Sequence, residues 1–190
     1  MNKTRAEHLP IEKFHPFEGH PFKVVDNEEM DQLVWSILTQ GLLTPLVVRP
    51  LANGEYEVIS GHRRLHACKR AGIKSIPALI TDMDRDAAAI ALVDSNLHRE
   101  HILPSEKAFA YKLKMDAMSH QGTSRQVGTK LRTDAVVGES VGESARQVQR
   151  YIRLTHLIPG ILHMVDDSKI ALTPAVEISY LTNREQRELL

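Results

Sequence analysis

A strand that runs through one glycine into a helix with a basic first turn constrains this chain most. The segment over residues 55–72 reads EYEVISGHRRLHACKRAG, so His62, Arg63 and Arg64 directly follow Gly61. A helix N-terminus already carries partial positive charge, so each cation there is unfavourable by about 0.3–1 kcal/mol unless an anion is nearby. We therefore predict a strand–helix unit with an anion site at its glycine.

A phosphate would suit this helix entrance. Ser60 and Gly61 present backbone N–H groups there, and the two arginines add charged donors that can grip phosphate oxygens. In the alternative interpretation, the arginines form ion pairs with acidic neighbours such as Glu57 or Asp94, and no ligand is needed. The short motif alone leaves both interpretations open.

The flanking sequence predicts a small α/β domain. Asn53 and Gly54 lie between two apolar runs, which is a strong hairpin signal. Other short apolar runs alternate with segments of helical periodicity, and these segments begin and end at Asn and Gly residues. We expect strands at 9–14, 45–50, 56–59 and 76–80, and helices at 27–41 and 62–71.

Beyond this domain the sequence is predominantly helical. An alanine-rich helix is expected at 86–95, and a second helix should begin with Ser105 as its N-cap and run to about Met118. Residues 119–133 are rich in Gly, Ser, Thr and Gln and have little periodicity, so we predict a loop there.

A second polar cluster lies between these two helices. Asn96, Arg99 and Glu100 fall within five positions. Amide and carboxylate oxygens are ligands that Mg²⁺ shares with nucleotide phosphates, and an arginine could reach a phosphate or DNA. A helix cap with surface ion pairs explains the same residues equally well.

Residues 135–154 predict a pair of helices joined by a turn. The turn falls at Gly142, and Ser144 with Gln147 fits a capping box, in which side chains satisfy free N–H groups at a helix start. Small Gly138 would let the two helices approach. This pattern is typical of a helix-turn-helix.

The second of these helices carries a basic face. Arg146, Gln149, Arg150 and Arg153 are neighbours on the helix surface. Arg and Gln read base edges or contact phosphates in a major groove, and Ser144 lies at the same helix start. The alternative is a solvated basic helix in an ordinary bundle.

Composition limits the remaining classes. The chain has 190 residues with 24 basic and 24 acidic side chains, yet residues 121–160 hold 6 and 3, a net charge of +3. The single cysteine, Cys68, indicates a reducing cytoplasm and argues against a structural zinc site. No signal peptide or membrane-spanning stretch is found, so we expect neither secretion nor a membrane partner.

Three segments together carry a family resemblance. ISGHRRLHACKRAG, DSNLHREHILPSEKA and GESARQVQRYIRL resemble, in this order, the motifs of ParB/RepB chromosome and plasmid partition proteins, in which GERRxRA and ENxxRE precede a helix-turn-helix. The resemblance runs from about Leu9 to Leu190. It implies a tail and first strand in 1–25, a ParB/sulfiredoxin-like α/β domain over 9–100, and an all-α helix-turn-helix domain over 101–190.

The resemblance also implies a ligand and a mechanism. Family members bind CTP with Mg²⁺, recognise a centromere-like palindrome in double-stranded DNA, and close as a homodimeric clamp that slow CTP hydrolysis reopens. A ParA-type ATPase is the expected partner, and the bacterial nucleoid or a plasmid is the expected location. The nucleotide-binding residues carried over are Ser60, Gly61, His62, Arg63, Arg64, Asn96, Arg99 and Glu100, with Asn96 and Glu100 assisting the metal.

This sequence departs from the family pattern at two positions. His62 and Ser95 stand where the motifs usually have Glu, so two carboxylates are missing and we expect binding more than turnover. The chain also stops at Leu190 without the family's dimerisation domain, and we expect a truncated form.

Three other classes of protein share some of these features. A repressor using only its helix-turn-helix would bind DNA regardless of nucleotide. Sulfiredoxin has a reactive cysteine where this chain has Gly61, while Cys68 lies inside the predicted helix. A nuclease would need a cluster of metal ligands that the sequence does not present.

Overall fold

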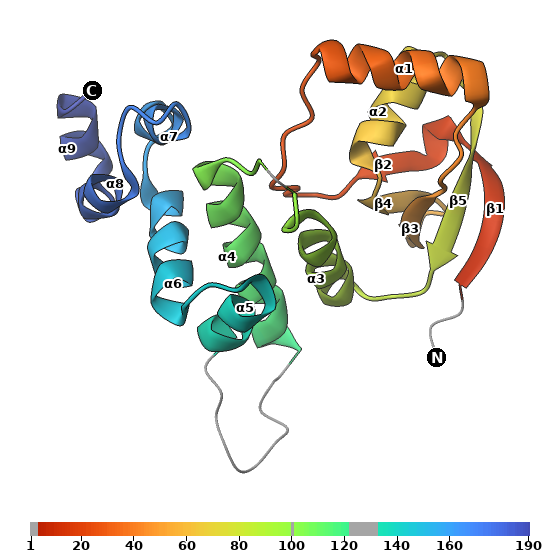
Figure 1. Ribbon diagram of the computed structural model, residues 1–190. Coiled ribbons are helices and arrows are strands. Elements are labelled where there is room, and N and C mark those ends of the chain that lie inside the picture. Colours follow the sequence, from red (N-terminus) through yellow and green to blue (C-terminus); the bar gives the residue numbers. More distant parts are fainter. Residues whose placement is uncertain (1–3, 100, 122–132) are drawn as a thin grey trace. The chain divides into compact units, whose positions relative to one another are not determined.

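The computed structural model describes residues 4–99, 101–121 and 133–190, and the chain forms two compact units, Met1–Leu92 and Val93–Leu190. Figure 1 labels the helices and strands of both units. Glu100 and most of the loop predicted at 119–133 lie outside the described residues.

The first unit contains a five-stranded mixed sheet with strand order β1-β5-β3-β4-β2. The strands are β1 (Thr4–Pro10), β2 (Phe14–Pro16), β3 (Leu46–Pro50), β4 (Tyr56–Ser60) and β5 (Ser75–Thr81). The pairs β1/β5 and β3/β4 are antiparallel, whereas β3/β5 and β2/β4 are parallel. The hairpin predicted at Asn53-Gly54 is confirmed, with Gly54 at a φ of +80°.

The single strand predicted at 9–14 is wrong. A short 3-10 turn at Ile11–Lys13 divides it, and its two halves join opposite edges of the sheet as β1 and β2. The backbone N–H of Ile11 donates to the carbonyl oxygen of Lys74 at 2.9 Å, which holds this crossing segment. Partner choice in a sheet is a tertiary effect, which a run of apolar residues does not encode.

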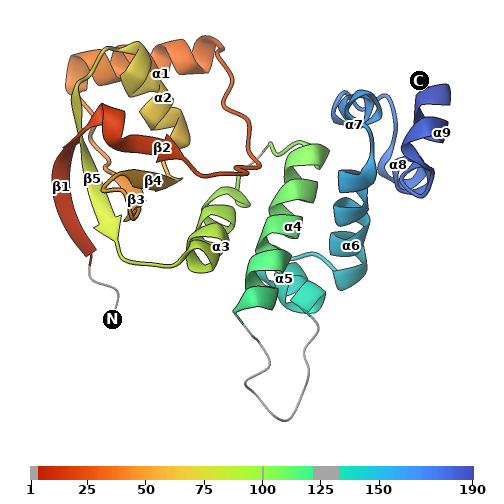
Figure 2. The same ribbon diagram turned by 180° about the vertical axis from the view of Figure 1, so that it is seen from behind.

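Two helices of the first unit lie side by side in both views (Figure 1, Figure 2). Helix α1 (Glu28–Gln40) starts as predicted, because Asn27 Oδ1 accepts a hydrogen bond from the Met30 N–H at 3.1 Å. Helix α2 (His62–Arg70) follows β4 after one residue. Buried side chains from both helices and the sheet form one core, including Phe14, Met30, Leu46, Val58 and Ile76.

Helix α3 (Arg85–Asn96) contains the division between the units, and the second unit is helical. Its helices are α4 (Pro104–His120), α5 (Thr133–Val141), α6 (Ala145–Arg153), α7 (Pro159–Asp166), α8 (Leu172–Ile178) and α9 (Asn183–Glu188). Helix α4 packs against α5, α6 and α7. No helix in the described parts of the chain combines the length and hydropathy needed to cross a bilayer.

The N-cap predicted for α4, Ser105, is also wrong. Leu103 is the N-cap and Pro104 occupies the first helical position, where its fixed φ and missing N–H cost nothing. Ser105 lies inside the helix and is buried, and its hydroxyl donates to Asp166 Oδ2 at 2.6 Å. Ser105 therefore ties α4 to the end of α7 instead of starting a helix.

Candidate functional site

The turn between β4 and α2 requires glycine at position 61. Gly61 is the N-cap of α2 and has a left-handed φ of +105°. A Cβ added there would lie 2.5 Å from Leu46 Cδ2 and 3.1 Å from Arg64 Nη2. Because Gly61 has no side chain, the chain can pass from the end of β4 into the first turn of α2 within one residue.

Arg64 is attached to the loop before β3. Its Nη1 donates to the carbonyl oxygens of Thr44 and Pro45 at 2.6 and 2.9 Å. Removal from water lowers the pKa of its guanidinium below the usual value, although an arginine remains charged. Arg64 therefore holds the fold of this loop.

Arg63 has a different environment. Its Nη2 lies 3.0 Å from Glu29 Oε2 on α1, in an ion pair whose side chains are 38% and 70% exposed. Such a pair contributes about 0–1 kcal/mol, so a ligand can replace it at little cost. Protein groups thus balance the charge at the start of α2, so a phosphate is not needed there for charge balance.

The acidic partners considered from the sequence are engaged elsewhere. Glu57 Oε2 accepts from Arg49 Nε at 2.6 Å, and Asp94 Oδ1 accepts from Lys114 Nζ at 2.5 Å. The arginines therefore do have protein partners, but these are Glu29 and two backbone carbonyls.

His62 connects α2 to the loop after β2. Its Nε2 accepts a hydrogen bond from the Phe17 N–H at 3.3 Å, and the centre of its ring lies 3.7 Å from that of His20. A pocket of about 170 Å³ opens beside this contact. Its lining combines apolar and basic side chains: Pro16, Val24, His62, Leu65, His66 and Lys69.

The second predicted motif lies in the other unit. Asn96 ends α3 and is 6% exposed, with its Nδ2 donating to Ser95 Oγ at 3.2 Å, whereas Arg99 is exposed. Glu100 lies outside the described residues. Among residues 4–99, 101–121 and 133–190, no three His, Cys, Asp or Glu side chains form a metal-binding group.

Helices α5 and α6 pack against each other around a tight turn. Gly142 has a φ of +69°, and a Cβ at Gly138 would collide with the carbonyl oxygen of Glu143. Ser144 Oγ accepts from the Gln147 N–H at 3.1 Å, as predicted. Gln147 does not complete the expected capping box, since its Oε1 accepts from Arg150 Nη1 at 3.2 Å.

The four residues of the predicted basic face differ in their surroundings. Gln149 Nε2 donates to Asp134 Oδ2 at 3.1 Å, which links α6 to α5. Arg153 Nη2 donates to the Ser179 carbonyl at 2.6 Å and its guanidinium lies 3.9 Å from the centre of the Tyr180 ring. Arg146 is exposed and forms no hydrogen bond or ion pair with the described residues.

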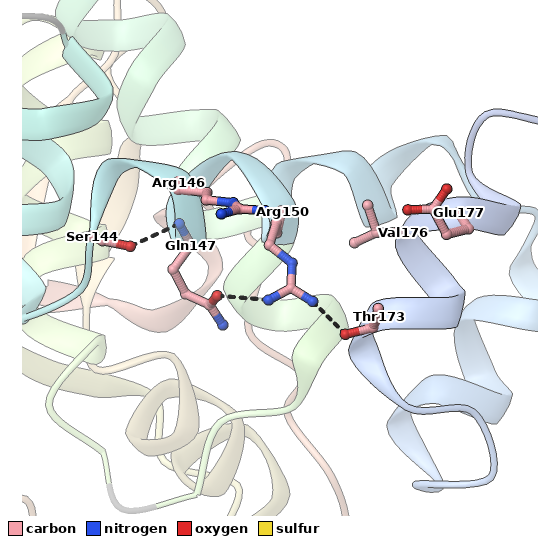
Figure 3. Close-up of a pocket in the computed structure, with 7 residues that line it drawn as sticks. All are labelled: Ser144, Arg146, Gln147, Arg150, Thr173, Val176 and Glu177. Atoms are coloured by element: carbon pink, nitrogen blue, oxygen red, sulfur yellow. Dashed lines mark hydrogen bonds between the residues drawn. The ribbon is translucent and has the colours of Figure 1, made fainter.

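A groove lies between α6 and α8 (Figure 3). It consists of adjoining pockets of about 440 and 360 Å³, both bordered by Arg146, Arg150 and Glu177. Sequence reasoning did not identify Thr173 and Glu177, which line this groove from α8. Thr173 lies 23 positions beyond Arg150, and no sequence motif connects residues of α8 with those of α6.

These features define a class: a mixed-sheet α/β unit with a glycine–arginine helix entrance, followed by a helical unit with a basic groove. The family model described as the ParB N-terminal domain matches residues 1–97. This chain therefore belongs to the ParB family.

Relatives match over nearly all of the chain. A nucleoid occlusion protein from Listeria monocytogenes is 30% identical over 187 residues, covering 98% of this chain and 61% of its own length. A probable chromosome-partitioning protein ParB from Pseudomonas putida is 30% identical over 189 residues, covering 99% and 61%. The chain thus spans about three fifths of the length of these relatives.

A solved structure supports the fold. The C-terminally truncated chromosome-partitioning protein ParB from Caulobacter crescentus, complexed to the centromeric parS site, aligns with a TM-score of 0.57 at 24% identity. The alignment covers 96% of this chain and 97% of that one.

Proposed function

We propose that this chain is a sequence-specific DNA-binding partition protein that acts as a CTP-dependent DNA clamp. Its membership of the ParB family supports the general role. The observation that carries the DNA-binding half is the groove beside α6, where Arg146 and Arg150 are open to a ligand.

The α5–α6 pair is the proposed helix-turn-helix. In this motif the N-terminal residues of the second helix enter the major groove and contact base edges. Ser144 and Arg146 lie at that end of α6, and Arg150 follows one turn later. Gln149 and Arg153, which attach α6 to its neighbours, support the reading helix and are not assigned a direct DNA contact.

Arg150→Ala tests this assignment. If Arg150 contacts a base, specific affinity should fall by about 1–3 kcal/mol and selectivity should relax at one position of the site. The probe is a duplex selected by the native chain from a pool with a randomised centre, and anisotropy measures the affinity. Unchanged preference at every base pair would refute the assignment.

The proposed nucleotide-binding site lies at the start of α2. The backbone N–H groups that follow Gly61 at the start of α2 are the proposed phosphate donors, and Arg63 can exchange Glu29 for a phosphate. Arg64 is then the residue that keeps the helix entrance in place. Asn96, Arg99 and Glu100 remain assigned to CTP and Mg²⁺ by family resemblance alone.

Rapid hydrolysis is not part of the proposal. Two family carboxylates are replaced by His62 and Ser95, and His62 already uses its Nε2 as an acceptor for the Phe17 N–H. We propose CTP binding with at most slow turnover. A homodimer, a ParA-type ATPase partner and a nucleoid or plasmid location belong to the same proposal.

A nucleotide-independent repressor is the second candidate. It is favoured by one observation, namely that Glu29 and two carbonyl oxygens balance the charge of Arg63 and Arg64 without a ligand. A repressor would bind its DNA site with the same affinity at every CTP concentration.

A further inference from the structure

Arg150 is held from two sides in the groove between α6 and α8 (Figure 3). Its Nη1 donates to Gln147 Oε1 at 3.2 Å, on the same helix. Its Nη2 donates to Thr173 Oγ1 at 2.6 Å, on α8. The guanidinium group therefore bridges two helices that are separate in sequence.

The guanidinium of Arg150 keeps free donors for a base even while it forms this bridge. A guanidinium has five N–H donors in a planar fork, and these two bonds use two of them. The remaining donors can serve the bidentate contact that arginine makes with guanine O6 and N7. Holding the side chain in advance also removes the entropy cost of ordering it during binding.

Building on the proposed DNA-binding function, we propose that Thr173 is a positioning residue for base recognition. Its hydroxyl oxygen fixes the guanidinium of Arg150 in the orientation in which it meets a base edge. Helix α8 thus supplies the second wall of the DNA-reading surface, and sequence selectivity depends on a residue outside the helix-turn-helix.

Thr173 is well placed for this role because the fold does not depend on it. It is exposed in the first turn of α8. The helix is attached to its unit by other groups, namely buried Ala175 and Val176 and the bonds from Arg153 to Ser179. Removing the Thr173 hydroxyl should therefore release Arg150 without loosening α8.

Two substitutions separate the hydroxyl from the shape of the side chain. Thr173→Val removes the acceptor and keeps the branched shape, whereas Thr173→Ser keeps the acceptor. The probe is the duplex selected by the native chain, together with copies changed at one base pair each. Anisotropy gives the affinities, and thermal unfolding of the same proteins gives their stability.

We expect Thr173→Val to weaken binding of the selected duplex by about threefold to tenfold, the cost of ordering one long side chain. The loss should appear as weaker discrimination at the base pair read by Arg150. The salt dependence should stay the same, because no phosphate contact is lost. Thr173→Ser should restore both affinity and discrimination.

A double substitution tests whether Thr173 acts through Arg150. In an Arg150→Ala background, Thr173→Val should have no further effect. The inference is overturned if Thr173→Val keeps native discrimination, or if its loss is the same in the Arg150→Ala background. A native chain that selects no duplex would instead overturn the proposed DNA-binding function, and this inference with it.

Discussion

At the scale of single residues, Gly61 should be the least replaceable glycine of the first unit. Gly61→Ala combines left-handed strain with a Cβ 2.5 Å from Leu46 Cδ2. We expect a loss of about 2–5 kcal/mol in the free energy of unfolding. Gly54 is the matched control, since its φ is +80° but an added Cβ would meet nothing within 4 Å.

Urea unfolding of both alanine variants makes this comparison. Gly54→Ala should lose only the backbone term of about 1–2 kcal/mol. Equal losses at the two positions would mean that the close approach of Leu46 is relieved without cost.

Substitutions of Arg63 and Glu29 should change the affinity for CTP in opposite directions. Arg63→Ala should weaken CTP binding by about 1.5–3 kcal/mol, because a charge-assisted hydrogen bond to phosphate is lost. Glu29→Gln should strengthen it by up to about 1 kcal/mol, because the competing carboxylate is removed. Isothermal titration calorimetry with Mg²⁺ measures both, and native affinity in both variants would remove Arg63 from the site.

Some of these residues could be predicted from the sequence and others could not. Gly61, Gly142 and Ser144 were predictable because turns and caps follow local rules. Arg63 and Arg64 look equivalent in the sequence, yet one pairs with a carboxylate 34 positions away and the other with carbonyls about 20 positions away. Local patterns contain no information on such partners.

At the level of single elements, substitutions on α6 should separate effects on stability from effects on DNA binding. Arg153→Ala removes bonds to Ser179 and the stacking on Tyr180, so unfolding free energy should fall by about 2–4 kcal/mol. Arg146→Ala removes no bond to the described residues and should leave stability unchanged.

DNA titrations at several salt concentrations complete this prediction. Arg146→Ala should weaken binding to every duplex and reduce the salt slope by about one, if Arg146 contacts a phosphate. A folded, fully stable Arg153→Ala protein that has lost DNA binding would reverse the roles assigned to the two arginines.

Most elements follow from periodicity and capping, and the exceptions have a common cause. The helix expected at 27–41 forms as Glu28–Gln40 between its Asn cap and its glycine stop. The split of the first strand and the burial of Ser105 depend on Lys74 and Asp166, which are distant in sequence. Likewise, the groove needs α8, which carries no motif that connects it to α6.

At the level of the whole molecule, the proposed function combines CTP binding with DNA binding. If CTP changes DNA affinity, then DNA must change CTP affinity by the same factor, because the two equilibria are linked. The units divide inside α3, between Leu92 and Val93, so a continuous helix joins the unit of Arg63 to the unit of Asn96.

The most direct measurement is a calorimetric titration of the native chain with CTP, GTP, ATP and UTP in Mg²⁺, with and without the selected duplex. We predict saturable binding of CTP in preference to the other three nucleotides, with an affinity that the duplex alters. Saturable duplex binding, with no nucleotide bound under either condition, would contradict the clamp and leave the nucleotide-independent repressor.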